Sequence, residues 1–218
     1  MSKPQISREV AAKVLQTVDQ GLSHGLGSPE PGKMCVEAAV CYALGLPHGD
    51  DPQCVGYAVR KYKIRLNDSN WSSPEARAKG LRRVAIAQLG SDQIDQRAFV
   101  EEVVLQTVRQ LLPIALRAAA SLNPDHSAAL EAQAAACEAV AAFSQVREVA
   151  LSAKKAAYAA DAAAYAAAAY AAAAAYAAYA AAAKKEKQDS ILSMAAEIAV
   201  QALIKLGSKG CEWLDLCE

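Results

Sequence analysis

Residues 156–183 read AAYAADAAAYAAAAYAAAAAYAAYAAAA, and this tract decides the fold class. It holds 22 alanines in 28 positions, and the exceptions are five tyrosines and Asp161. Alanine has the highest helix propensity of all residues, and neither Gly nor Pro occurs between Ala128 and Leu206. The tract therefore predicts one helix of about 40 residues, roughly 60 Å long at about 1.5 Å per residue.

The tyrosines of this tract share one side of the expected helix. At about 100° per residue, Tyr158, Tyr165 and Tyr176 fall near one line, Tyr179 lies to one side of it, and Tyr170 points elsewhere. Alanine lets another helix approach closely, while each tyrosine ring offers a broad apolar contact. We expect the tract either to pack on its own domain or to self-associate through Tyr158, Tyr165, Tyr176 and Tyr179.

Helix caps, glycines and prolines punctuate the rest of the chain so regularly that the sequence predicts an all-α protein. The most apolar helix spans residues 33–44, where Lys33 and Glu37 are the only charged residues. We expect Glu37 at an exposed edge, with burial beside a cation as the alternative. The expected starts are Ser7, Asp51 with Pro52, Ser73 with Pro74, and Asp92 or Asp95, and the expected stops are Gly21, Gly45, Gly90 and Gly207.

The clearest break in the chain is Asn123 followed by Pro124, and we place the domain boundary there. The sequence predicts a helical, bundle-like N-terminal domain over residues 1–122. Residues 123–218 form a C-terminal helical region with the long Ala/Tyr helix. Further interruptions are expected at Pro113, near Phe143 and at Gln188 to Ser190, and an amphipathic helix from Ser190 to Leu206 closes the chain.

Composition narrows the class of protein. Lys plus Arg and Asp plus Glu are both 23, so the net charge gives no overall attraction to nucleic acid, membranes or acidic substrates. The N-terminus lacks an apolar run of signal-peptide length, which predicts a cytoplasmic protein whose six cysteines are free thiols. The Ala tract is too weakly hydrophobic for a membrane span. Three histidines and no CxxC pair argue against a zinc site, and no cofactor is implied.

Basic side chains concentrate in residues 60–83, where eight Lys and Arg residues accompany two acidic residues. Guanidinium groups bind phosphates and aromatic rings stack on bases, so this mixture indicates a nucleotide or nucleic acid ligand. A solvated helix face, a core position for Trp71, and docking on an acidic protein are the alternatives. The candidate ligand-binding residues are Arg60, Lys61, Tyr62, Lys63, Arg65, Trp71, Arg82 and Arg83.

A second candidate for chemistry is Cys35, in the first turn of the expected apolar helix, because a helix N-terminus lowers the pKa of a thiol. The placement is similar to that in papain-like peptidases, which place their histidine far downstream, but downstream of Cys35 this chain offers only His48 and His126 as bases. A buried, inert thiol is the main expectation, and a Cys35-dependent hydrolase or transferase is the alternative. His48, Asp50 and Asp51 could bind a metal, although HGDDP is also typical of a turn followed by a helix cap.

The runs CVEAAVCYALGLPHGDDPQCVGYAVRKYKIRLND and WSSPEARAKGLRRVAIAQLGS, followed by the Ala/Tyr tract, resemble a group of hypothetical proteins of bacteria and bacteriophages. The resemblance covers most of residues 30–185. It implies no activity, cofactor or catalytic residue. A phage or mobile-element setting favours small binding, inhibitory or sequestering proteins over metabolic enzymes.

These observations lead us to expect a non-enzymatic helical protein that forms homo-oligomers and binds a phosphate-bearing ligand through the basic segment. The alternative is a scaffold or protein-binding module that acts through the long helix.

Overall fold

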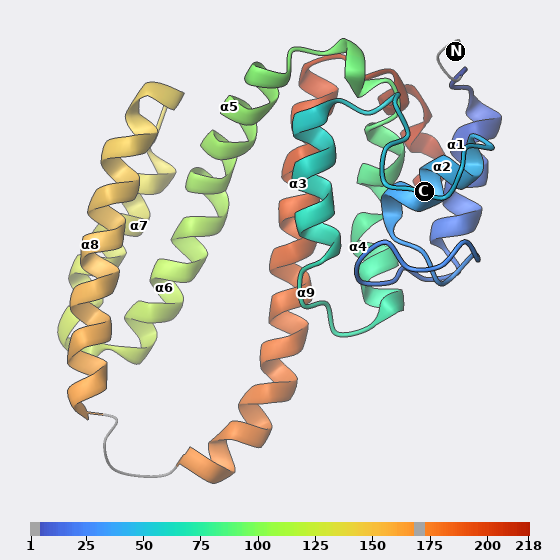
Figure 1. Ribbon diagram of the computed structural model, residues 1–218. Coiled ribbons are helices and arrows are strands. Elements are labelled where there is room, and N and C mark those ends of the chain that lie inside the picture. Colours follow the sequence, from blue (N-terminus) through green and yellow to red (C-terminus); the bar gives the residue numbers. More distant parts are fainter. Residues whose placement is uncertain (1–4, 168–172) are drawn as a thin grey trace. The chain divides into compact units, whose positions relative to one another are not determined.

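The computed structural model describes the backbone of residues 5–167 and 173–218, and the side chains of these ranges outside residues 157–186. Over this part of the chain the secondary structure is helical without a strand, and one β-bridge joins Gly27 to Met34 (Figure 1). The all-α fold class predicted from the sequence is confirmed.

The chain forms two compact units. Unit 1 consists of Met1–Val100 together with Ala182–Glu218, and unit 2 consists of Glu101–Ala181. The end of the chain thus belongs with its beginning, whereas the sequence suggested a division at Asn123.

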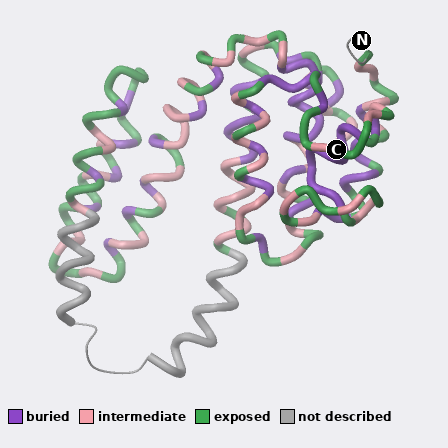
Figure 2. The backbone as a smooth tube through the Cα atoms, viewed as in Figure 1, coloured by how far each residue is buried: buried purple, intermediate pink, exposed green. Residues whose placement is uncertain are grey.

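Unit 1 is built around α4 (Pro74–Ala87), which packs against α1 (Arg8–Val18), α2 (Val36–Ala43) and the C-terminal 3-10 helix η4 (Lys209–Cys217) (Figure 1). Leu81, Val84 and Ile86 of α4 are buried in this core. Figure 2 colours the buried positions of the chain purple. The other helices of this unit are α3 (Tyr57–Asn67), the short η1 (Ser91–Gln93), the start of α5 (Gln96–Gln106) and the C-terminal part of α9 (Ala173–Lys205).

A glycine allows η4 to close on α4. The backbone N–H of Gly210 donates to the carbonyl oxygen of Leu89 over 2.6 Å. A Cβ atom on Gly210 would lie 2.0 Å from the carbonyl oxygen of Ile86, so no other residue fits this approach. The Ser208 hydroxyl donates to the carbonyl oxygen of Ala87 over 2.7 Å and completes the junction.

Several predicted caps are present. The Ser7 hydroxyl accepts from the backbone N–H of Val10, and Ser73 does the same for Ala76 at the start of α4. Of the two aspartates proposed to open the next helix, Asp95 is the cap, because its carboxylate accepts from the backbone N–H groups of Arg97 and Ala98.

Two predicted starts were wrong. The helix expected from Lys33 begins only at Val36, because the β-bridge between Gly27 and Met34 holds the preceding backbone extended and Cys35 is the N-cap. Asp51 and Pro52 do not open α3. The N-cap of α3 is Gly56, whose backbone N–H donates to the Ser91 hydroxyl.

The interruption expected at Gln188 to Ser190 is absent, because α9 runs through these residues to Lys205. Within this stretch, the Asp189 carboxylate accepts hydrogen bonds from the backbone N–H and the hydroxyl of Ser72. These bonds fix the residues before α4, and the backbone of α9 stays helical.

Unit 2 contains α6 (Leu112–Leu122), α7 (Ser127–Glu138) and α8 (Phe143–Ala167), which pack on one another around Leu116, Leu130 and Cys137. The disturbance expected at Pro113 takes the form of the π-helical turn η2 (Thr107–Leu111), because proline cannot continue the helical hydrogen bonds of the preceding turn. The helix ends predicted near Asn123 and Phe143 are present, and the 3-10 helix η3 (Pro124–His126) joins α6 to α7.

The Ala/Tyr tract is described only in part. Helix α8 reaches Ala167 and α9 begins at Ala173, so the single long helix expected here crosses residues outside the described backbone. The side chains proposed for self-association, Tyr158, Tyr165, Tyr176 and Tyr179, lie outside the described side chains. Among the described helices, none has the length and apolarity needed to cross a membrane.

Candidate anion-binding site

The two aromatic residues proposed for base stacking have internal partners. Trp71 is buried, and its indole N–H donates to the carbonyl oxygen of Leu66 over 2.9 Å. The Tyr62 hydroxyl donates to the carbonyl oxygen of Ala195 over 3.0 Å, and its ring meets Phe99 edge-on at 6.3 Å between centroids. Burial raises the pKa of Tyr62 to about 12. Trp71 therefore belongs to the core, as the alternative expectation had it, and Tyr62 ties α3 to α9.

Lys63, also proposed as a ligand-binding residue, forms a buried ion pair with Glu37. Its Nζ lies 3.0 Å from Oε1 of Glu37, and neither side chain exposes any surface. Burial raises the pKa of Glu37 and lowers that of Lys63, while each charge partly offsets the effect on the other. The expectation that Glu37 lies at an exposed edge was therefore wrong. Glu37 of α2 is buried because the ammonium of Lys63, on α3, is buried beside it.

Three further arginines of the set have carboxylate partners at the surface of unit 1. Such pairs hold guanidinium groups in place but compete with an incoming phosphate for their N–H groups. The pairs are Arg60 with Asp51 at 2.9 Å, Arg82 with Asp19 at 2.8 Å, and Arg83 with Glu197 at 3.0 Å.

The cations left without a carboxylate include Lys61 and Arg65, which lie one turn apart on the outer face of α3. Both side chains are exposed, and no described carboxylate lies within ion-pair distance of either. Tyr57 stands one turn before Lys61 on the same face, with 67% of its surface exposed. The Lys61 ammonium lies 5.7 Å from the centroid of its ring, and the Arg60 guanidinium lies 6.0 Å from it. We call Tyr57, Arg60, Lys61 and Arg65 the α3 face.

Tyr57 was missed in the sequence because the basic segment was taken to begin at Arg60. The spacing of Tyr57, Lys61 and Arg65 at i, i+4 and i+8 is the signal that could have found it, since residues four apart share a helix face. This spacing sets the three side chains about 6 Å apart along the helix axis.

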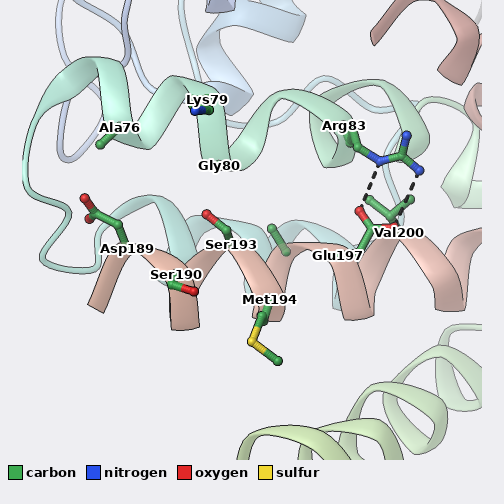
Figure 3. Close-up of a pocket in the computed structure, with 11 residues that line it drawn as sticks. Ala76, Lys79, Gly80, Arg83, Asp189, Ser190, Ser193, Met194, Glu197 and Val200 are labelled. Carbon is green, nitrogen blue, oxygen red and sulfur yellow. Dashed lines mark hydrogen bonds and ion pairs between the residues drawn. The ribbon is translucent and has the colours of Figure 1, made fainter. Parts of the chain in front are cut away.

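A groove of about 650 Å³ between α4 and α9 offers a concave alternative (Figure 3). Lys79 and Arg83 of α4 line it, but Asp189 and Glu197 of α9 balance their charges. The Arg83–Glu197 pair, dashed in Figure 3, spans the groove. Lys79 is the cation of this lining that has no carboxylate partner among the described residues. The groove is thus electrically neutral, and the α3 face is the better match for an anion.

Neither a protein-family model, nor a curated protein, nor a solved structure matches the chain. The geometry described above therefore carries the functional argument by itself.

Cys35 has the features of a structural thiol. It is buried at the N-cap of α2, where its Sγ accepts from the backbone N–H of Ala38 at 3.4 Å. Burial raises the pKa of the thiol, and this effect outweighs the backbone hydrogen bonds that favour the thiolate. His48, the first histidine downstream of Cys35, instead contacts the carbonyl oxygen of Gly27 over 3.2 Å.

A metal site at His48, Asp50 and Asp51 gains no support. Across the described residues, no group of three or more His, Cys, Asp or Glu side chains is arranged to hold a metal ion. Asp51 instead forms an ion pair with Arg60. Through this pair the HGDDP turn holds one residue of the α3 face in place.

Proposed function

We propose that the protein binds a phosphate-bearing ligand on the α3 face, and that the ligand class fitting this face best is single-stranded nucleic acid. The observation that carries the proposal is an exposed tyrosine ring with two cations beside it and a third cation further along the same helix face. Arg60, Lys61 and Arg65 were candidates in the sequence, and Tyr57 takes the stacking role first suggested for Tyr62 or Trp71.

The chemistry of the α3 face supports this ligand class. An exposed aromatic ring stacks on any base, because every base has a π-face, and nearby cations attract the backbone phosphates. Lys61 and Arg65 carry full charges that no described carboxylate neutralises. Arg60 keeps its pair with Asp51 at 2.9 Å, so it holds its position beside the ring when the ligand is absent.

The shape of the surface favours an extended ligand over a compact one. Small ligands generally bind in concave sites that bury most of their surface. The α3 face is the outer side of a helix, and its three exposed side chains follow one another at about 6 Å intervals. A strand that lies along the helix can place one base on Tyr57 and successive phosphates near Lys61 and Arg65.

The test is fluorescence anisotropy of a labelled oligothymidylate at low salt, with the full chain and single-residue variants. Tyr57→Ala should weaken binding roughly fivefold to a hundredfold, the range expected from the loss of one stacked base. Lys61→Ala and Arg65→Ala should each weaken it as well, because each removes one phosphate contact.

Lys79→Ala is the matched control, since Lys79 is an exposed cation on α4 with no carboxylate partner among the described residues. It changes the net charge by the same amount as Lys61→Ala. Equal losses in the two variants would mean that general charge attraction explains the binding. A loss confined to Lys79→Ala would move the site to the groove between α4 and α9.

A further inference from the structure

The buried carboxylate of Glu37 is incompletely satisfied. Lys63 approaches Oε1, but the contact lacks the direction of a hydrogen bond, and Oε2 has no partner among the described residues. A buried polar atom without a partner is costly and rare in folded proteins. An occupant that the protein itself does not supply would remove this cost.

Glu37 lines a small cavity that can hold such an occupant. The cavity has a volume of about 80 Å³ and is lined by residues of α2, of α3 and of the loop around Gly25. At roughly 30 Å³ per water molecule, this space accepts two or three water-sized groups. Asp50 is exposed at this lining, whereas Glu37 is fully buried.

The lining has one sign of charge. It contains the carboxylates of Glu37, Asp50 and Asp68 and no Lys, Arg or His. Asp68 uses one oxygen, Oδ1, to accept from the backbone N–H of Gly25 and from the side-chain amide of Asn67, both over 2.8 Å. The apolar side chains of Leu26, Val36 and Ile64 complete the wall. The cavity therefore offers several hydrogen-bond acceptors, the acidic residues Asp50 and Asp68 beside the Glu37 that Lys63 pairs, and space for a carbon or two.

We propose that this cavity binds the protonated head of a small primary amine. An alkylammonium group donates three hydrogen bonds and carries a positive charge, which none of the lining residues supplies. One of its N–H groups would pair with Oε2 of Glu37, on the side away from Lys63. The site is separate from the α3 face, has the opposite preference for charge, and does not depend on nucleic acid binding.

The test is a titration of the ¹⁵N-labelled full chain with methylammonium chloride, followed by amide chemical shifts. The shifts of Gly25, Cys35 and Glu37 should change and saturate. Tetramethylammonium, which has no N–H donor and is bulkier, and sodium at equal ionic strength should leave these amides unchanged. A response that does not saturate, or that is the same for all three salts, means that the cavity holds water only and overturns the proposal.

Two aspartate variants keep the test independent of folding. Asp50→Asn removes an exposed carboxylate of the lining and should weaken methylammonium binding about twofold to fivefold, the effect of losing one exposed charge interaction. Asp51→Asn is the matched control, because Asp51 is exposed and adjacent in sequence but pairs with Arg60 and does not line the cavity. Equal effects of the two variants contradict the proposal.

Glu37→Gln should abolish the saturable response. Because this change leaves Lys63 without its carboxylate, far-UV circular dichroism must first show that the variant is helical. If it is not, the double variant Glu37→Gln with Lys63→Met serves instead, since it removes the unpaired charge. Saturable binding by either folded variant, equal to that of the unaltered chain, overturns the role of Glu37.

Discussion

The ammonium of Lys63 lies 3.0 Å from Oε1 of Glu37, and both side chains are wholly excluded from solvent. The pair joins α2 to α3, the helix that carries the proposed nucleic acid surface. Transfer of both charges out of water is costly, and their attraction offsets that cost only while both partners remain.

Loss of one partner should therefore be far more damaging than loss of both. Lys63→Met alone should lower the free energy of unfolding by about 3–5 kcal/mol, because it leaves the Glu37 charge buried and unpaired. Lys63→Met combined with Glu37→Met should recover most of this loss. Urea denaturation of Lys63→Met, Glu37→Met, the double variant and the original chain measures the cycle. Arg8→Ala, which removes the exposed ion pair with Asp215, is the control. It should lower the free energy of unfolding much less.

Stability should fall in alkaline solution because of two buried thiols. Burial raises the pKa of Cys41 from 9.0 to about 12 and that of Cys54 from 9.0 to about 11. Above pH 9 the unfolded chain loses these protons while the folded chain keeps them, so stability present below pH 9 is lost as the pH rises towards 11. Each such thiol adds a slope of about 1.4 kcal/mol per pH unit.

Urea denaturation under reducing conditions at several pH values from 8 to 11 measures this slope. The variant with Cys41→Ala and Cys54→Ala should show a shallower decline, because it has no thiol to ionise at these positions. An unchanged slope would assign the alkaline loss to other groups.

Thiol labelling should separate structural cysteines from accessible ones. Cys35, Cys41, Cys54 and Cys137 are buried, whereas Cys211 and Cys217 are half-buried near the C-terminus. Intact-mass and peptide analysis after mild alkylation at neutral pH should find Cys211 and Cys217 modified first. Fastest modification of Cys35 would contradict the structural role given to it and would favour the hydrolase or transferase alternative.

The sequence predicted a helix start correctly where the capping side chain binds the backbone of the helix that follows it. Ser7, Ser73 and Asp95 cap the helices that follow them. Asp51 was expected to cap a helix and Asp189 lies in an expected helix break, but both carboxylates bind other segments, as partners of Arg60 and Ser72. A carboxylate in a sequence cannot reveal which distant donor it will meet, so tertiary contacts decided these two positions.

The sequence predicted a basic segment with aromatic residues, but it did not predict which of these side chains are exposed. The density of Lys and Arg in residues 60–83 does not tell which of them pair internally. Lys63 is buried because Glu37 faces it, and Arg77 is buried because it donates to the carbonyl oxygens of Leu22 and Asn67. These partners come from helices and loops distant in sequence, and their positions require the fold.

Self-association through the Ala/Tyr tract stays a prediction from the sequence. Changing Tyr158, Tyr165, Tyr176 and Tyr179 to alanine removes most of the aromatic surface on one side of the expected helix. Multi-angle light scattering should show an oligomer for the original chain and a smaller species for the variant. A monomer in both cases would contradict the prediction.

The salt dependence of oligothymidylate binding tests the proposed function most directly. For single strands, the logarithm of the association constant falls with the logarithm of salt concentration by about 0.7 for each phosphate contact. The double variant Lys61→Ala with Arg65→Ala should therefore bind with a slope shallower by about 1.4, while Lys79→Ala keeps the slope of the original chain. Equal slopes for the double variant and the original chain would contradict a phosphate-binding role for the α3 face.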